Sequence, residues 1–185
     1  RMRARVSLDA GVNEWVEVKT RFATGVGDPV CGNESLDSGA STKDFGLDRF
    51  YVVLNLDGAK VLGGKVKNPF ITTKDLVFDG DLNPEGVAFQ TSTGEDLELF
   101  LNAGVFAAEE RSSDDDTLMY GAQVGASAAL SEGVDVLVGG SVYAWDNMAG
   151  FATLYDPTDS FGNSAVAVLD EMGLETGELL YTEDY

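Results

Sequence analysis

Strict alternation of polar and apolar residues is the feature that most limits how this chain can fold. Residues 1–10 carry polar side chains at every odd position and apolar side chains at every even position. A similar period of two returns over residues 16–24, after a short turn. Because a period of two places successive side chains on opposite faces of a strand, these two segments predict a β-hairpin with unlike faces.

Alternating segments continue along the chain and are joined by connections of two different lengths. Further strands are predicted at about residues 46–56, 60–67, 86–92, 97–108, 118–130 and 134–146. Short turns join the two strands of each hairpin. Longer polar loops join one hairpin to the next, at about residues 25–45, 68–85, 109–117 and 147–177. The sequence therefore predicts an all-β, antiparallel meander of eight strands in four hairpins.

The last of these loops is less regular than the others. Residues 165–174 are expected to form a short helix, and residues 178–185 to begin a ninth strand. The whole chain is expected to form a single β-barrel domain, residues 1–185. Because the chain starts inside a predicted strand, this domain is expected to be incomplete.

Turn lengths and strand lengths distinguish a membrane barrel from a soluble sheet. Transmembrane barrels have short turns at one end and long loops at the other. The predicted strands also approach the roughly 9 to 11 residues that a tilted strand needs to cross a bilayer. We therefore expect a transmembrane β-barrel, with eight to nine strands in this chain and more in the whole barrel. The alternative is a soluble extracellular β-sandwich that acts as a binding or adhesion module, favoured if the apolar faces pack together.

Composition excludes several classes of function. No run of about 18 apolar residues could span a membrane as a helix. The net charge of -20 argues against a nucleic-acid partner, because phosphates would be repelled. The chain has no histidine and a single cysteine, Cys31, which removes histidine-based catalysis and any internal disulfide. We expect a protein that is not an enzyme.

The polar face of the predicted strands carries charged residues at spacing two. Such residues fit a water-filled lumen better than a dry core. The basic ones could attract anions, or they could pair with Asp9, Glu17, Asp48 and Glu98 and only brace the wall. The candidate pore-lining residues are Arg1, Arg3, Arg5, Lys19, Arg21, Lys65, Lys67, Asp9, Glu17 and Glu98.

A second candidate site lies in the loop at residues 68–85. Oxygen-bearing side chains alternate there as at the start of a calcium-binding loop, at Asp79, Asp81, Asn83 and Glu85. The sixth position of such a loop should be glycine, but Pro84 occupies it. The competing interpretation is a turn held by hydrogen bonds between side chains and backbone. No other cofactor is expected.

Several motifs, in order along the chain, resemble the putative-porin family of Gram-negative outer-membrane proteins. The resemblance runs from Arg1 to about Asp146, and more loosely beyond residues 161–164. The motifs that carry it lie at residues 23–29 (ATGVGDP), 65–70 (KVKNPF), 75–86 (DLVFDGDLNPEG) and 109–116 (EERSSDDD).

This resemblance implies a closed barrel with a water-filled passage for small hydrophilic solutes or ions. It also implies the bacterial outer membrane, with lipid and lipopolysaccharide around the barrel, and it leaves homo-oligomerisation open. Members of the family are longer than this chain, so the strands predicted here would form part of such a barrel.

Overall fold

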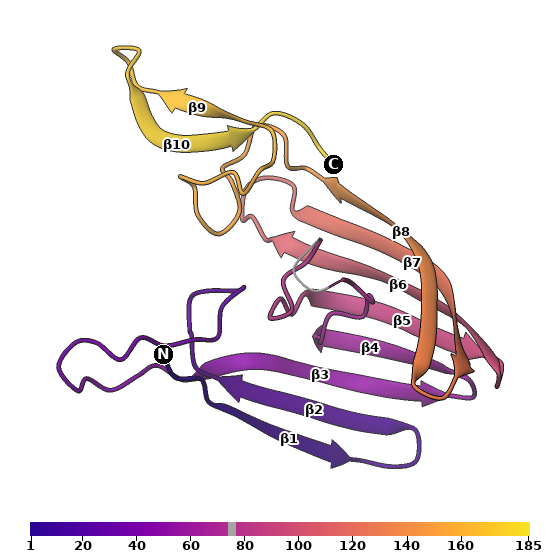
Figure 1. The fold of residues 1–185 in the computed structure, drawn as a ribbon. Coiled ribbons are helices and arrows are strands. Elements are labelled where there is room, and N and C mark those ends of the chain that lie inside the picture. Colours follow the sequence, from indigo (N-terminus) through magenta and orange to yellow (C-terminus); the bar gives the residue numbers. More distant parts are fainter. Residues whose placement is uncertain (74–76) are drawn as a thin grey trace.

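The structure, a computed structural model, describes residues 1–73 and 77–185. Every regular element in this described part is a β-strand (Figure 1). No helix in the same residues has the length and apolar character needed to cross a membrane. The strands are β1 (Arg5–Gly11), β2 (Val16–Ala23), β3 (Gly46–Leu56), β4 (Ala59–Lys65), β5 (Glu85–Thr93), β6 (Leu97–Glu109), β7 (Thr117–Ser131), β8 (Val134–Asp146), β9 (Ala165–Leu169) and β10 (Glu175–Tyr181).

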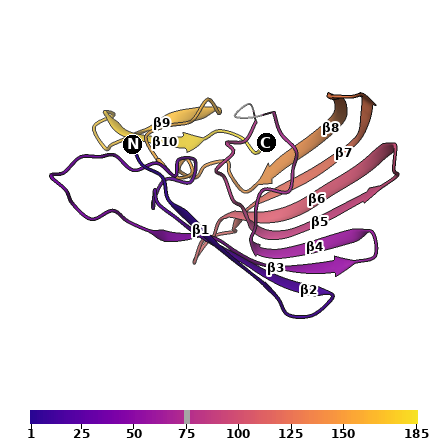
Figure 2. The ribbon, with the colours of Figure 1, turned by 60° about the horizontal axis from the view of Figure 1, so that its bottom comes forward.

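Strands β1 to β8 form one antiparallel sheet in which each strand pairs with its sequence neighbours. The eight predicted strands and four hairpins are confirmed. Tight turns set the hairpin registers: Gly58 and Gly133 have φ angles of 73° and 78°, which favour glycine. The sheet is strongly curved (Figure 2). It is an open sheet, in which β1 and β8 each pair on one side, so these strands do not close a barrel among themselves.

The two faces of the curved sheet differ in what covers them. The described residues of the β4–β5 connection, 66–73 and 77–84, lie inside the curve (Figure 2). On the convex face, apolar side chains such as Val52, Leu101 and Val138 are exposed. The core is therefore between the sheet and the β4–β5 connection. Its buried residues are Tyr51, Val53, Leu62, Val66, Phe70, Phe78, Ala88, Phe106 and Met119.

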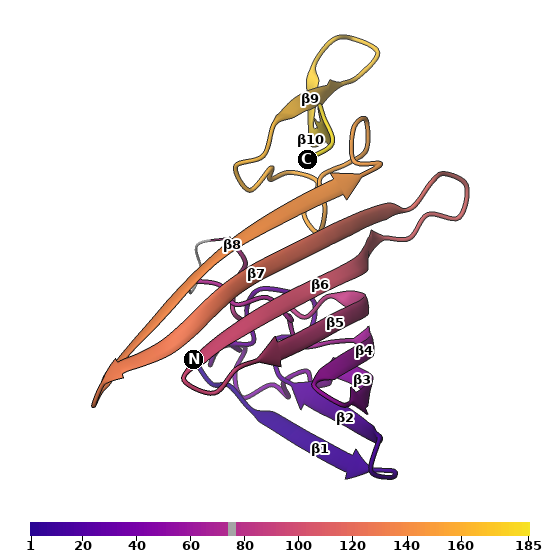
Figure 3. The same cartoon turned by 90° about the vertical axis from the view of Figure 1, so that its right-hand side faces the viewer.

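The helix expected at residues 165–174 is wrong. Alternating alanine and valine favour an extended chain, and Ala165–Leu169 forms β9, which pairs with β10. Between them, the Asp170 carboxylate accepts hydrogen bonds from the backbone N–H groups of Met172 and Leu174, and Gly173 has a φ of 78°. The expected ninth strand is present as β10, but it ends at Tyr181 and does not join the large sheet. The β9–β10 hairpin lies beyond the long-loop end of the sheet (Figure 3).

Candidate functional site

An aromatic side chain of the β4–β5 connection packs over a glycine on the concave face of the sheet. The Phe70 ring packs edge-on against Tyr143 and Phe106, with ring centroids 5.1 and 6.2 Å away. It lies directly over Gly121, where an added Cβ atom would stand 2.3 Å from the Phe70 ring. Only glycine at this position leaves room for the ring, so Gly121 determines how closely the connection approaches the wall.

A row of side-chain amides holds the backbone of the same segment. The Gln123 side chain accepts a hydrogen bond from the Ile71 N–H (2.9 Å) and donates one to the Ile71 carbonyl (2.6 Å). The Gln90 amide donates to the Pro69 carbonyl at 3.0 Å. Asn102, on the strand between them, donates to Gln123 at 3.1 Å. These side chains of the sheet therefore form hydrogen bonds to the backbone of the connection, as a neighbouring strand would. Each bond adds about 1 kcal/mol net to the stability.

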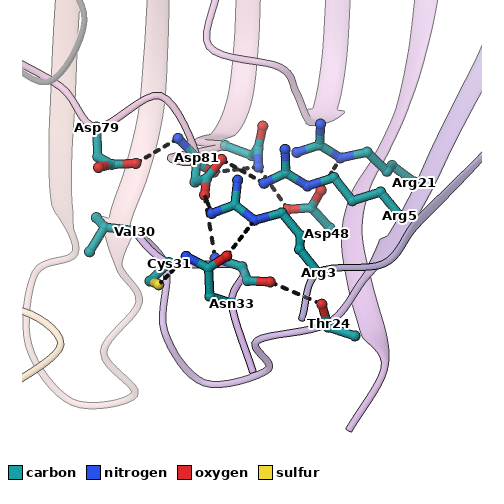
Figure 4. A network of polar contacts seen from close by, with 12 residues as sticks. Arg3, Arg5, Arg21, Thr24, Val30, Cys31, Asn33, Asp48, Asp79 and Asp81 are labelled. Carbon is teal, nitrogen blue, oxygen red and sulfur yellow. Dashed lines mark hydrogen bonds and ion pairs between the residues drawn. The ribbon is translucent and has the colours of Figure 1, made fainter. Parts of the chain in front are cut away.

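The second half of the connection is held by arginines from β1 and the residues before it (Figure 4). Asp81 bridges Arg3 and Arg5, with N···O distances of 2.9 and 2.5 Å, and also accepts the Gly32 N–H at 3.3 Å. Arg3 also donates to Asn33 at 3.0 Å. These contacts fix Asp81 between the N-terminal strand and the β2–β3 loop.

A β-bulge brings the next acidic residue into place. The register of β2 and β3 shifts between Arg21 and Phe22, and Asp48 is the extra residue on β3. Asp48 pairs with Arg21 and accepts a hydrogen bond from the Asn83 amide at 2.8 Å, while Arg49 donates to the Asn83 side-chain oxygen at 2.6 Å. We call the group Arg3, Arg5, Arg21, Arg49, Asp48 and Asp81 the arginine cluster.

The arginine cluster carries excess positive charge on a partly exposed region of the concave face. Its four guanidinium groups face two carboxylates, which leaves a formal excess of two positive charges. The Arg21 side chain is 12% exposed, and its buried Nη2 atom has no hydrogen-bond partner in the described part of the chain. A low-dielectric wall strengthens the field of such charges, so this part of the concave face would attract anions.

Acid should loosen the connection at Asp81. Burial alone would raise the pKa of this carboxyl, but the hydrogen bond from Arg5, the Gly32 N–H and the charges of Arg5 and Arg3 outweigh it, so the pKa lies below the ordinary 3.8. Because the pKa is lower in the folded protein than in the unfolded chain, the ionised Asp81 carboxylate stabilises the folded connection above pH 3.8. This stabilisation is lost as the pH falls below that value and the carboxylate is protonated. We expect the protection of residues 77–84 from hydrogen exchange, corrected for intrinsic rates, to be lower at about pH 3 than at pH 6, for a contribution on the order of 1 kcal/mol.

The control for this acid effect is the Asp81→Asn variant, which should exchange at similar, faster rates at both pH values once intrinsic rates are corrected. Asp79→Asn, two residues away, should keep the dependence of the native protein. Equal protection of residues 77–84 at both pH values in the native protein would contradict the assignment.

The other predicted pore-lining residues are distributed over both faces. Lys19 lies on the concave face and pairs with Asp9 and Glu17 at 3.4 and 3.0 Å, nearer the short turns. Glu98 also lies on this face, where it accepts a hydrogen bond from Ser127 at 3.3 Å. Lys19 therefore forms the ion pairs that the wall-bracing alternative describes.

Lys65 is the last residue of β4. It pairs across the sheet with Phe50, whose side chain is exposed on the convex face. Lys65 forms an ion pair with Glu85 at 2.8 Å at this edge of the sheet, and both residues line the same hollow as Arg5, Asp48 and Asp81. Lys67 follows the end of β4 and Arg1 precedes β1, and both are exposed.

The structure does not bring the four candidate calcium ligands together. Asp81 pairs with arginines, Asn83 bonds to Asp48 and Arg49, and Glu85 pairs with Lys65. No group of three or more acidic, cysteine or histidine side chains in residues 1–73 and 77–185 could hold a metal ion. The Asp79 carboxylate instead accepts the Asp81 N–H at 2.7 Å, as the competing turn interpretation describes.

Two hollows lie on either side of the β4–β5 connection. One, of about 790 Å³, opens at the long-loop end and is lined by Arg5, Asp48 and Asp81. The other, of about 520 Å³, lies toward the short turns and is lined by Ile71 of the connection together with wall residues. The connection thus stands between two open spaces on the concave face.

Comparison with known proteins assigns the chain to a family. Searches of curated proteins and of solved structures give no match. A family model described as a putative porin matches residues 1–165 of the 185 residues. This match covers the whole eight-stranded sheet, the arginine cluster and the amide row. The chain therefore belongs to the putative porin family.

Proposed function

We propose that this protein is an outer-membrane porin, a passive channel for small hydrophilic solutes or ions, and not an enzyme. In this proposal the convex face meets the lipid bilayer, with lipopolysaccharide in its outer leaflet. The concave face lines the water-filled passage, and the β4–β5 connection narrows it. The family match supports the channel function.

The observation that carries this proposal is that the sheet exposes its apolar face, whereas a soluble protein buries it. Apolar side chains on the convex face remain exposed, whereas arginines, carboxylates and amides lie on the concave face. Leaving one large apolar side chain in water instead of burying it forfeits about 1.5 to 3 kcal/mol. A soluble β-sandwich would cover such a face with a second sheet, and strands β1 to β8 form a single sheet. A lipid bilayer would cover the apolar convex face without a second sheet.

The open edges of the sheet are part of the same proposal. Strands β1 and β8 each have one neighbour, so one side of each backbone lacks a strand partner. Within lipid, unpaired backbone groups cost several kcal/mol each, so membrane-spanning sheets are closed. We therefore place this sheet in a closed barrel, in which β1 and β8 pair with further strands.

Adjacent residues of β8 allow a test of the membrane assignment. Val138 and Leu137 are 68% and 51% exposed and point to the convex and concave faces, respectively. We expect Val138→Arg to lower the stability of the protein in lipid vesicles by about 2 to 4 kcal/mol, because the arginine would lie in hydrocarbon. The matched Leu137→Arg variant should unfold in urea like the native protein and still insert and conduct. Equal behaviour of the two variants, or no conductance by the native protein in planar bilayers, would favour the soluble sandwich.

A further inference from the structure

We propose that the concave face holds a binding subsite for neutral saccharides, centred on Phe100, between the β4–β5 connection and the short turns. The subsite is the hollow of about 520 Å³ described above. This inference rests on the proposed channel function, since it places the subsite on the path of a solute.

An aromatic ring forms the floor of the hollow. Phe100 of β6 extends across Gly125 and Gly139, which pair directly on β7 and β8. A Cβ atom at Gly125 would stand 2.3 Å from the Phe100 ring, and one at Gly139 would stand 3.5 Å from it. The two glycines therefore let the ring lie against the wall. Phe100 is half-buried and lines the hollow, so part of its ring remains accessible from the lumen.

Polar groups from three neighbouring strands surround this ring. Ser92 of β5 pairs in register with Phe100, and Gln90 lies two residues before it. Glu98 lies two residues before Phe100 on β6 and accepts a hydrogen bond from Ser127 of β7. All of these side chains line the same hollow. Hydroxyl, amide and carboxylate groups thus surround an apolar surface.

The hollow differs from the arginine cluster in its net charge. Lys60 and Glu98 both line it, and their formal charges cancel. Lys60 pairs in register with Gln90, so this cation lies on the wall beside the amide row. A neutral solute is therefore favoured here, whereas the arginine cluster favours anions.

Saccharides combine the two kinds of surface that this hollow offers. One face of a pyranose ring presents C–H groups, which the negative face of an aromatic ring attracts. Its hydroxyls both donate and accept hydrogen bonds, and therefore match serine, amide and carboxylate groups. An alkyl chain would leave these polar groups unpaired. Ile71 of the connection borders the hollow. A bound sugar would therefore lie next to the β4–β5 connection, on its short-turn side.

The test uses sucrose as the probe, with the protein in planar bilayers and, in parallel, in detergent for calorimetry. Sucrose should reduce the single-channel current in a saturable way, and calorimetry should give a matching affinity. Phe100→Ala should weaken sucrose binding by about tenfold or more, which is the factor typical of a nucleic-acid base stacked on an aromatic side chain, a flat contact of similar size. Phe100→Leu, which keeps apolar volume, should weaken it similarly, and Phe100→Tyr should retain it. Phe50→Ala removes a ring from the convex face and should bind sucrose normally.

The outcomes separate this inference from the proposed function. A conducting protein that shows neither current reduction nor saturable binding would overturn the saccharide subsite and leave the porin intact. Equal sucrose binding by Phe100→Ala and the native protein would also overturn it. Saturable binding that is lost in Phe100→Ala, in a protein that does not conduct, would support the subsite and overturn the channel.

Discussion

Replacing Gly121 by valine is expected to release the β4–β5 connection and to raise the single-channel conductance by at least about twofold, because conductance follows the width of the aqueous path. A Cβ atom at position 121 would stand 2.3 Å from the Phe70 ring, and two valine methyl groups would occupy the ring's place. Phe70 cannot move aside within the core, since Tyr143 and Phe106 already contact it. Overpacking of this kind costs about 1 to 3 kcal/mol, comparable to the bonds that hold Ile71 and Pro69.

Two variants control the interpretation of this result. Gly140 lies on the convex face with open space around its Cα atom, so Gly140→Val makes the same change without contacting the connection. It should conduct like the native protein. Phe70→Ala removes the seated ring without adding bulk, and should also raise the conductance. If Gly121→Val folds normally but conducts like Gly140→Val, the connection does not narrow the passage.

The sheet could be predicted from the sequence because its two determinants are local. Side-chain alternation marks each strand, and turn residues such as Gly58 and Gly133 mark each hairpin. Neither signal depends on contacts between distant residues. The predicted strand boundaries therefore lie within a few residues of β1 to β8.

The inward position of the β4–β5 connection could not be predicted in the same way. Its docking depends on Phe70 meeting Gly121, two residues that are far apart in the sequence. Because the connection covers the concave face, Val53 and Leu62 point inward although they are apolar, and alternation no longer separates lumen from lipid there.

The missed site residues required the register between strands. Gln90, Asn102 and Gln123 are single polar residues on separate strands, and only cross-strand pairing aligns them in a row. Their shared polar parity on adjacent predicted strands was the available signal. Arg49 gave a weaker signal, because the β-bulge at Asp48 interrupts the alternation beside it.

Neutralising two arginines of the arginine cluster is expected to abolish the anion preference of the channel. In the double variant Arg21→Gln/Arg49→Gln, two positive and two negative charges remain, so the formal excess of two falls to zero. We expect the anion-to-cation permeability ratio, measured from the reversal potential across a salt gradient, to fall to about one. Salt near 0.1 M suits this measurement, because the Debye length there is about 10 Å and screening by ions stays limited.

A charge-balanced variant separates this electrostatic effect from a change in structure. Arg21→Gln/Asp48→Asn also removes the ion pair between Arg21 and Asp48. It leaves the formal excess at two positive charges, since three arginines then face one carboxylate. It should retain the anion preference. If the charge-balanced variant loses the preference as fully as Arg21→Gln/Arg49→Gln does, selectivity depends on the geometry of the wall and not on its net charge.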